Sequence, residues 1–197
     1  MTATSDLLER RDAVARLLAG RGEVLVVTGL GSPTYDVHAT GDHDANYYLW
    51  GAMGGASLVG FGLAQAQPGR RVLVITGDGE QLMAFGGLAT IAAARPTNLD
   101  IVVLDNEHYG ETGMQTSHTG LGIDLAAVAA ALGFADSRVV TTDDELAELI
   151  HDQKTPSTGP RLAVLKIRAE NLPRSMPSRD AVFIKNRFRA NLGLAPN

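Results

Sequence analysis

The sequence contains no cysteine. Disulfides, thiolate zinc sites and iron–sulfur clusters ligated by this chain are therefore excluded. No run of about 18 or more apolar residues occurs, so no membrane-spanning helix is expected. The formal net charge is −5, which argues against the basic surface that nucleic-acid binding requires. The start of the chain, MTATSDLLERRDAVARL, lacks the long apolar segment of a signal peptide, and a cytoplasmic protein is expected.

The 197 residues, of which 45% are hydrophobic, are enough for one domain with a buried core. We predict a single domain over residues 1–197, with a C-terminal tail from about residue 171. The tail carries the basic stretch KNRFR. This stretch could bind an anionic substrate or a partner chain, but a solvated helix end is the more common reason for such a pattern.

Short β-branched runs alternate with helical patterns along the chain. Strands are expected at 23–29, 71–77, 99–106, 137–140 and 161–169, and helices at 5–20, 51–67, 80–95, 124–133 and 142–152. This alternation predicts an α/β fold, a doubly wound and mostly parallel sheet with helices on both faces. Two long segments, 29–48 and 106–122, are expected to be loops. They and the turn after residue 76 follow strands, so all three should converge at one edge of the sheet.

The turn Gly77-Asp78-Gly79 permits a close backbone approach to a ligand and places a carboxylate beside a helix that begins near Glu80. Phosphate binds at helix N-termini, and a divalent cation could bridge phosphate and carboxylate. An ordinary Asp-Gly turn is the commoner explanation when the motif stands alone. Asn106, one helix and one strand later, changes that balance, because a βαβ unit brings the two strand ends together. Its amide oxygen and a nearby carbonyl are ligands that Mg²⁺ accepts.

These motifs resemble the cofactor motif of thiamine diphosphate enzymes, in which an Asn-bearing turn follows a Gly-Asp-Gly turn after one helix and one strand. Within that family the chain resembles the β subunits of sulfopyruvate decarboxylase, and phosphonopyruvate decarboxylase. The resemblance covers about residues 22 to 170. It rests on three stretches in the same order, which are YYLWGAMGGASLVGFGLA, GDGEQLMAFGGLATIAA and DNEHYGETGMQT.

The resemblance implies a role for each matching residue. Asp78 and Asn106 would bind Mg²⁺ through their side chains, and His108 through its carbonyl. Two residues would take part in catalysis by shaping the cofactor: the Gly51 carbonyl would contact the aminopyrimidine, and Met53 would be the apolar wedge beneath the bent thiamine diphosphate. The residues that would line the diphosphate are Gly31, Ser32, Thr34, Gly79 and Glu80, and the further cofactor-binding residues would be Gly77, Tyr109, Gly110 and Thr112.

Some positions call for a second interpretation. Many relatives have Ser where this chain has Glu80, whose carboxylate would repel phosphate unless it turns away or caps the helix backbone. Asp105 replaces the first Asn of the usual pair, a substitution that looks common in decarboxylase β subunits. Outside its motif, Met53 would be taken for core packing. His43 and His118 lie in the two long loops and are candidate proton carriers or substrate contacts, although solvated loop histidines are more common.

Thiamine diphosphate enzymes also use a glutamate from a separate pyrimidine-binding domain, for which this chain has no room. The resemblance therefore implies a separate α subunit that carries the glutamate, in an α₂β₂ or higher hetero-oligomer. The implied reaction is non-oxidative decarboxylation of a small anionic 2-oxo acid to an aldehyde.

Three alternatives remain open at this point. The first is a carboligase or acetyltransferase with the same cofactor, similar to acetolactate synthase. The second is a nucleotide-binding subunit, since TGLGSPTYD begins like a dinucleotide fingerprint, although Thr34 replaces its third glycine. The third is a structural subunit that binds no cofactor.

Overall fold

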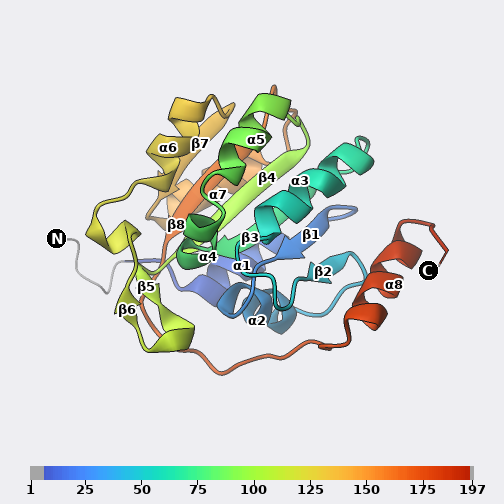
Figure 1. The fold of residues 1–197 in the computed structure, drawn as a ribbon, viewed down its shortest axis with the longest axis horizontal. Helices are drawn as coiled ribbons and strands as arrows, with labels where there is room; N and C mark the ends of the chain where they lie inside the picture. Colours follow the sequence, from blue (N-terminus) through green and yellow to red (C-terminus); the bar gives the residue numbers. More distant parts are fainter. Residues whose placement is uncertain (1–6, 196–197) are drawn as a thin grey trace.

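The structure is a computed structural model that describes residues 7–195 (Figure 1). Its centre is a six-stranded parallel sheet in the order β2-β1-β3-β4-β8-β7. The strands of this sheet are β1 (Leu25–Thr28), β2 (Asn46–Tyr48), β3 (Val72–Gly77), β4 (Leu99–Asp105), β7 (Asp136–Val140) and β8 (Arg161–Lys166). The helices are α1 (Arg10–Leu18), α2 (Ser32–Ala39), α3 (Ala56–Ala66), α4 (Asp78–Met83), α5 (Gly87–Ala94), α6 (Leu125–Leu132), α7 (Asp143–Asp152) and α8 (Ala181–Asn191).

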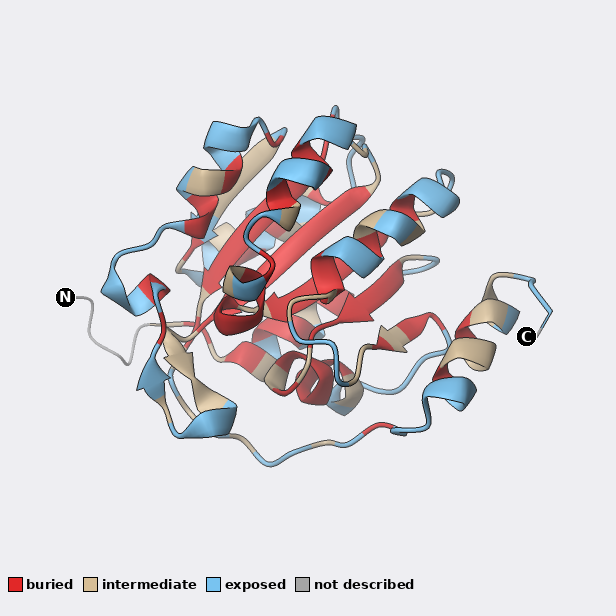
Figure 2. Cartoon of the chain, viewed as in Figure 1, coloured by how far each residue is buried: buried red, intermediate tan, exposed pale blue. Residues whose placement is uncertain are grey.

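Side chains of the strands alternate between two separate hydrophobic cores. In β3, Val72 and Val74 pack into the core beneath α3, α5 and α6, whereas Leu73 and Ile75 pack into the core beneath α1, α2 and α7. Figure 2 shows the sheet buried between these two helical layers. A sheet that is covered on both faces needs apolar residues at every strand position. The predicted doubly wound parallel sheet is thus confirmed.

Small residues allow the helices to approach the sheet and one another closely. A Cβ atom on Gly60 of α3 would lie 2.2 Å from Val74 Cγ2 on the sheet. A Cβ atom on Gly87, at the start of α5, would lie 3.1 Å from the Leu58 side chain of α3. Larger residues at either position would separate these layers, because packed interiors leave no room for an added methyl group.

The first helix is shorter than predicted. It begins at Arg10, where Glu9 is the N-cap and accepts hydrogen bonds from the backbone N–H groups of Arg11 and Asp12. Leu8 forms a parallel bridge with Ile167 and so extends the sheet instead of the helix. The predicted caps at residues 5 and 6 lie outside the described residues.

Two further expectations about local structure are wrong. The segment 29–48 contains α2 and β2, because Pro33 favours the first turn of a helix and Val26 to Thr28 of β1 pair with 46–48. The helix expected over 80–95 is divided into α4 and α5 at residues 84–86. The segment 106–122 also has some structure of its own: β5 (His108–Tyr109) and β6 (Gln115–Thr116) form a short antiparallel pair.

The C-terminal segment returns across the molecule and ends in α8, beside β2 (Figure 1). Ile184 and Phe188 of α8 are buried. Arg187, in the basic stretch of the tail, pairs with Asp42 at 2.6 Å, so this residue fixes α8 to the domain. None of the helices formed by residues 7–195 is long and apolar enough to span a membrane.

Candidate active site

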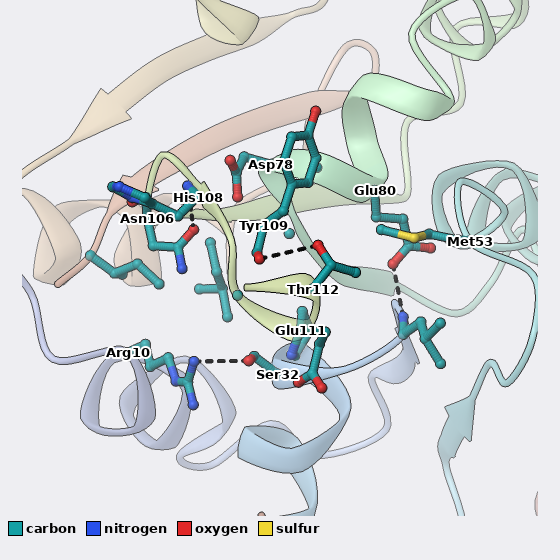
Figure 3. Close-up of a pocket in the computed structure, with 17 residues that line it drawn as sticks. Arg10, Ser32, Met53, Asp78, Glu80, Asn106, His108, Tyr109, Glu111 and Thr112 are labelled. Atoms are coloured by element: carbon teal, nitrogen blue, oxygen red, sulfur yellow. Dashed lines mark hydrogen bonds between the residues drawn. The ribbon is translucent and has the colours of Figure 1, made fainter. Parts of the chain in front are cut away.

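A pocket lies at the carboxyl ends of β1, β3 and β4, the three adjacent central strands (Figure 3). The chain runs from β1 outward to β2 and then crosses to β3 on the other side of β1, so the pocket is at the point where the strand order reverses. Ligands of doubly wound folds bind at this point. The cavity has a volume of about 230 Å³. As expected, the segments after all three strands contribute to it.

Most of the predicted site residues line this pocket, although their roles there stay predictions. The pocket-lining members of the predicted set are Ser32, Met53, Gly77, Asp78, Glu80, Gly79, Asn106, His108, Tyr109, Gly110 and Thr112. The additional polar residues that line it are Arg10 and Glu111.

Asp78 and Asn106 are brought together by the register of the sheet. Gly77, the last residue of β3, pairs with Leu104 of β4, so Asp78 and Asn106 lie immediately beyond two adjacent strand ends. Asp78 is 3% exposed. Its burial, opposed by a hydrogen bond from Ser117 and reinforced by the nearby charge of Asp105, raises the pKa of the carboxyl group to about 6.

A buried polar network behind the pocket holds the Asp78 carboxylate. Ser117 donates a hydrogen bond to Asp78 Oδ2, and Thr119 contacts the same oxygen at 3.3 Å. Thr119 also donates to Asp105 Oδ1 at 2.7 Å, and Lys166 pairs with Asp105 Oδ2 at 2.9 Å. Both hydroxyl groups contact the same carboxylate oxygen, Oδ2. Sequence reasoning missed this network, because nothing in the pattern of the loop singles out Ser117 or Thr119.

The donor atoms beside Asp78 are suited to a hard cation. The Asn106 Oδ1 atom accepts a hydrogen bond from His108 N at 2.9 Å, and an amide oxygen retains a second lone pair. No cluster of three or more His, Asp or Glu side chains suited to a metal occurs within residues 7–195. A cation bound here would therefore have to use Asp78 together with amide and carbonyl oxygens, the kind of ligand that Mg²⁺ prefers.

Gly79 allows the Tyr109 ring to close one side of the pocket. A Cβ atom at residue 79 would lie 2.7 Å from Cδ1 and Cε1 of Tyr109, closer than non-bonded carbon atoms approach. The Tyr109 hydroxyl group lies 3.2 Å from His118 Nδ1. His118 therefore does not line the pocket itself but contacts a residue that does.

The Glu80 carboxylate is held by backbone N–H groups. It accepts hydrogen bonds from Leu30 N at 2.8 Å and from Ala56 N at 3.4 Å, and the side chain is 3% exposed. Burial raises its pKa, against these hydrogen bonds. Glu80 thus connects the loop after β1 to the start of α3. A carboxylate that caps a helix backbone in this way was one of the two arrangements in which Glu80 would not repel a phosphate.

Four other predicted residues lie outside the pocket lining. The Thr34 hydroxyl group is buried and donates to the Gly29 carbonyl at 2.7 Å. Gly31, at φ 80°, is the N-cap of α2, and Gly51, at φ 72°, lies two residues before Met53. His43 precedes β2 and so lies at the amino ends of the parallel strands, the edge of the sheet opposite to the pocket. Its Nδ1 atom accepts a hydrogen bond from Ala45 N.

The fold and the pocket together define a cofactor-binding α/β domain with its site at the strand switch point. Comparison with known proteins gives the family: residues 30–166 match the thiamine pyrophosphate enzyme, C-terminal TPP binding domain, and the chain belongs to this family. Thiamine pyrophosphate is the same compound as thiamine diphosphate.

Relatives with known names are similar over nearly the whole chain. Sulfopyruvate decarboxylase subunit beta of Methanothermobacter thermautotrophicus is 38% identical over 92% of this chain and 94% of its own length. Phosphonopyruvate decarboxylase of Streptomyces viridochromogenes is 36% identical over 93% of this chain, but only 46% of that protein is matched. The crystal structure of benzoylformate decarboxylase from Polynucleobacter necessarius has the same fold, with a TM-score of 0.70 and 24% identity over 84% of this chain and 34% of that one.

Proposed function

We propose that this chain is the diphosphate-binding β subunit of a thiamine diphosphate- and Mg²⁺-dependent decarboxylase that acts on a small anionic 2-oxo acid. The placement of Asp78 and Asn106 at adjacent strand ends, inside one pocket, is the observation that carries this proposal. Asp78, Asn106 and the His108 carbonyl would hold the Mg²⁺ ion. The bound cofactor supplies the electron sink that lets a 2-oxo acid lose CO₂.

The residues of this chain would bind and orient the cofactor. Ser32, Gly79 and Tyr109 line the pocket and would contact the diphosphate. Met53, which lines the pocket from the connection between β2 and α3, would support the bent cofactor, with the Gly51 carbonyl at its aminopyrimidine. His118, which contacts the Tyr109 hydroxyl group at 3.2 Å, would exchange protons with a substrate. His43 has no such position.

Among residues 7–195, every acidic side chain that lines the pocket already has a partner, which supports a separate α subunit as the source of the acid for the aminopyrimidine. Three acidic residues line it, and each is engaged: Asp78 by Ser117, Glu80 by two backbone N–H groups and Glu111 by Arg174 at 2.8 Å. The chain also spans about half of the phosphonopyruvate decarboxylase that it matches. We infer that a partner of similar size supplies the glutamate, in an α₂β₂ or higher assembly.

An apolar surface beside the pocket supports the same inference. Met83 and Phe85, from the end of α4 and the turn after it, are 65% and 41% exposed, and Ile123 is 44% exposed. Together with Gly79, Tyr109 and His118 they line a second, shallower depression. Exposed apolar patches of this kind mark sites of protein association. An α subunit bound here would cover the cofactor pocket as well.

The test is to isolate the tagged chain from its native cells and to assay the complex with Mg²⁺, thiamine diphosphate and a panel of 2-oxo acids, including sulfopyruvate and phosphonopyruvate. We expect a co-purifying subunit, stoichiometric cofactor, and CO₂ and aldehyde in equal amounts. Formation of a new carbon–carbon bond in place of the aldehyde would indicate a carboligase. A protein that stays free of cofactor would exclude the proposal.

A further inference from the structure

Arg10 is the only Arg or Lys among the described residues that line the pocket. It reaches the pocket from the first turn of α1 and lies next to Ser32, across the cavity from Asp78 and Asn106 (Figure 3). Three acidic residues line the same cavity. A diphosphate ester is multiply charged at neutral pH, and Mg²⁺ beside an ionised Asp78 would neutralise only part of that charge.

Arg10 is buried and ion-paired in this position. Its side chain is 4% exposed, and its Nε atom lies 2.9 Å from Asp36 Oδ2. Asp36 is fully buried and also pairs with Arg11 at 3.1 Å. Two guanidinium groups thus share one carboxylate. Burying a cation is costly unless it is paired, and here one carboxylate pairs with two cations, of which only Arg10 lines the pocket.

The hydrogen bond between Arg10 and Ser32 also fixes the direction of the serine hydroxyl group. Arg10 Nη1 donates to Ser32 Oγ at 2.9 Å. A hydroxyl group has one hydrogen to donate, and an arginine has no acceptor. The Ser32 hydrogen must therefore point away from Arg10, and a phosphate oxygen in the pocket could accept it.

We propose that Arg10 binds the diphosphate group of the cofactor, both by its own charge and by orienting the Ser32 hydroxyl group as a donor. The proposal rests on the proposed function, since that function brings thiamine diphosphate to this pocket. It assigns to α1 a part in cofactor binding, whereas the matched family domain begins only at residue 30.

The experiment measures affinity and not turnover. The tagged full chain is isolated with its co-purifying subunit and stripped of cofactor, and the dissociation constants of thiamine diphosphate and of inorganic pyrophosphate are measured by calorimetry with Mg²⁺. The main variant combines Arg10→Met with Asp36→Asn, so that no unpaired carboxylate stays buried. We expect at least about a tenfold weaker affinity for both ligands, because charge-assisted hydrogen bonds to phosphate are lost.

Two single variants complete the design. Arg11→Met removes the other partner of Asp36 but does not alter the pocket lining, and should leave both affinities unchanged. Arg10→Lys keeps the charge and the pairing with Asp36 while losing the planar donor fork, so it should fold even if the double variant does not, and should bind both ligands with measurably weaker affinity than wild type.

The outcomes separate the two proposals. If the wild-type complex binds thiamine diphosphate and the Arg10 variants bind it equally well, the inference about Arg10 is wrong and the proposed function stands. Loss of affinity for thiamine diphosphate without loss for pyrophosphate would also exclude a contact with the diphosphate. If the wild-type complex binds no thiamine diphosphate at all, the proposed function fails, and this inference with it.

Discussion

The Glu80 carboxylate accepts a hydrogen bond from the backbone N–H group of Leu30 at 2.8 Å. Through this contact the residue after the Gly-Asp-Gly turn is joined to the loop after β1. The same carboxylate reaches Ala56 at the start of α3. From the sequence alone, Glu80 looks unfavourable for phosphate binding. In the structure it instead joins three segments around the pocket, which are the turn after β3, the loop after β1 and the start of α3.

Replacing Glu80 should therefore lower stability. Glu80→Ala leaves two backbone N–H groups without their acceptor, and we expect a loss of about 3 kcal/mol in the free energy of unfolding, measured by urea denaturation. Glu80→Gln keeps one acceptor oxygen and should lose less. Glu23→Ala, at a side chain that is 86% exposed, is the control and should change stability by no more than about 0.5 kcal/mol. Equal stability of the two alanine variants would contradict this role.

The ionised Asp78 carboxylate should destabilise the metal-free protein. Its folded-state pKa, about 6, exceeds the ordinary value of 3.8 because of burial. Between these pH values the folded protein binds more protons than the unfolded chain, so stability falls as the pH rises through this window. With EDTA, Asp78→Asn should be more stable than wild type at pH 7, by up to on the order of 3 kcal/mol, and similar to it at pH 3.5.

Adding Mg²⁺ and thiamine diphosphate should reverse that order, because a ligand stabilises only the protein that binds it. The midpoint of thermal unfolding of wild type should rise with ligand concentration, whereas that of Asp78→Asn should not move. If the stability difference between wild type and Asp78→Asn in EDTA does not change with pH, burial does not raise the pKa of Asp78.

The sequence was sufficient to predict that the segments around the pocket meet, because the carboxyl edge of a parallel sheet brings together the segments that follow its strands. Asp78 and Asn106 could be paired on this basis alone. Ser117 and Arg10 could not, since a serine in a long loop and an arginine in an amphipathic helix carry no local signal. Their positions depend on the β5–β6 pair and on the packing of α1 against α2, which are tertiary features. His43 was misplaced in the prediction because β2 divides its loop from the pocket.

The apolar depression beside the pocket should be the binding surface of the α subunit. Met83→Asp places a charge on this surface, and burying that charge in an interface without a partner is costly. We expect the tagged variant to lose its co-purifying subunit while its urea midpoint stays close to that of wild type. Val182→Asp, at an exposed apolar residue of α8, is the control and should retain the subunit. Retention by both variants would place the interface elsewhere.

The contact between Gly79 and the Tyr109 ring can be tested by a double-mutant cycle. Gly79→Ala introduces a Cβ atom 2.7 Å from two ring carbons, and we expect about 1–3 kcal/mol of destabilisation together with weaker binding of the cofactor, since both residues line the pocket. In the Tyr109→Ala background the clash is absent and the same substitution should be nearly neutral, which gives a coupling energy of about 1 kcal/mol or more.

Gly86→Ala is the matched control, because a Cβ atom there meets nothing within 4 Å and its φ of −65° suits alanine. Additive effects of Gly79→Ala and Tyr109→Ala would show that the added methyl group does not clash with the Tyr109 ring.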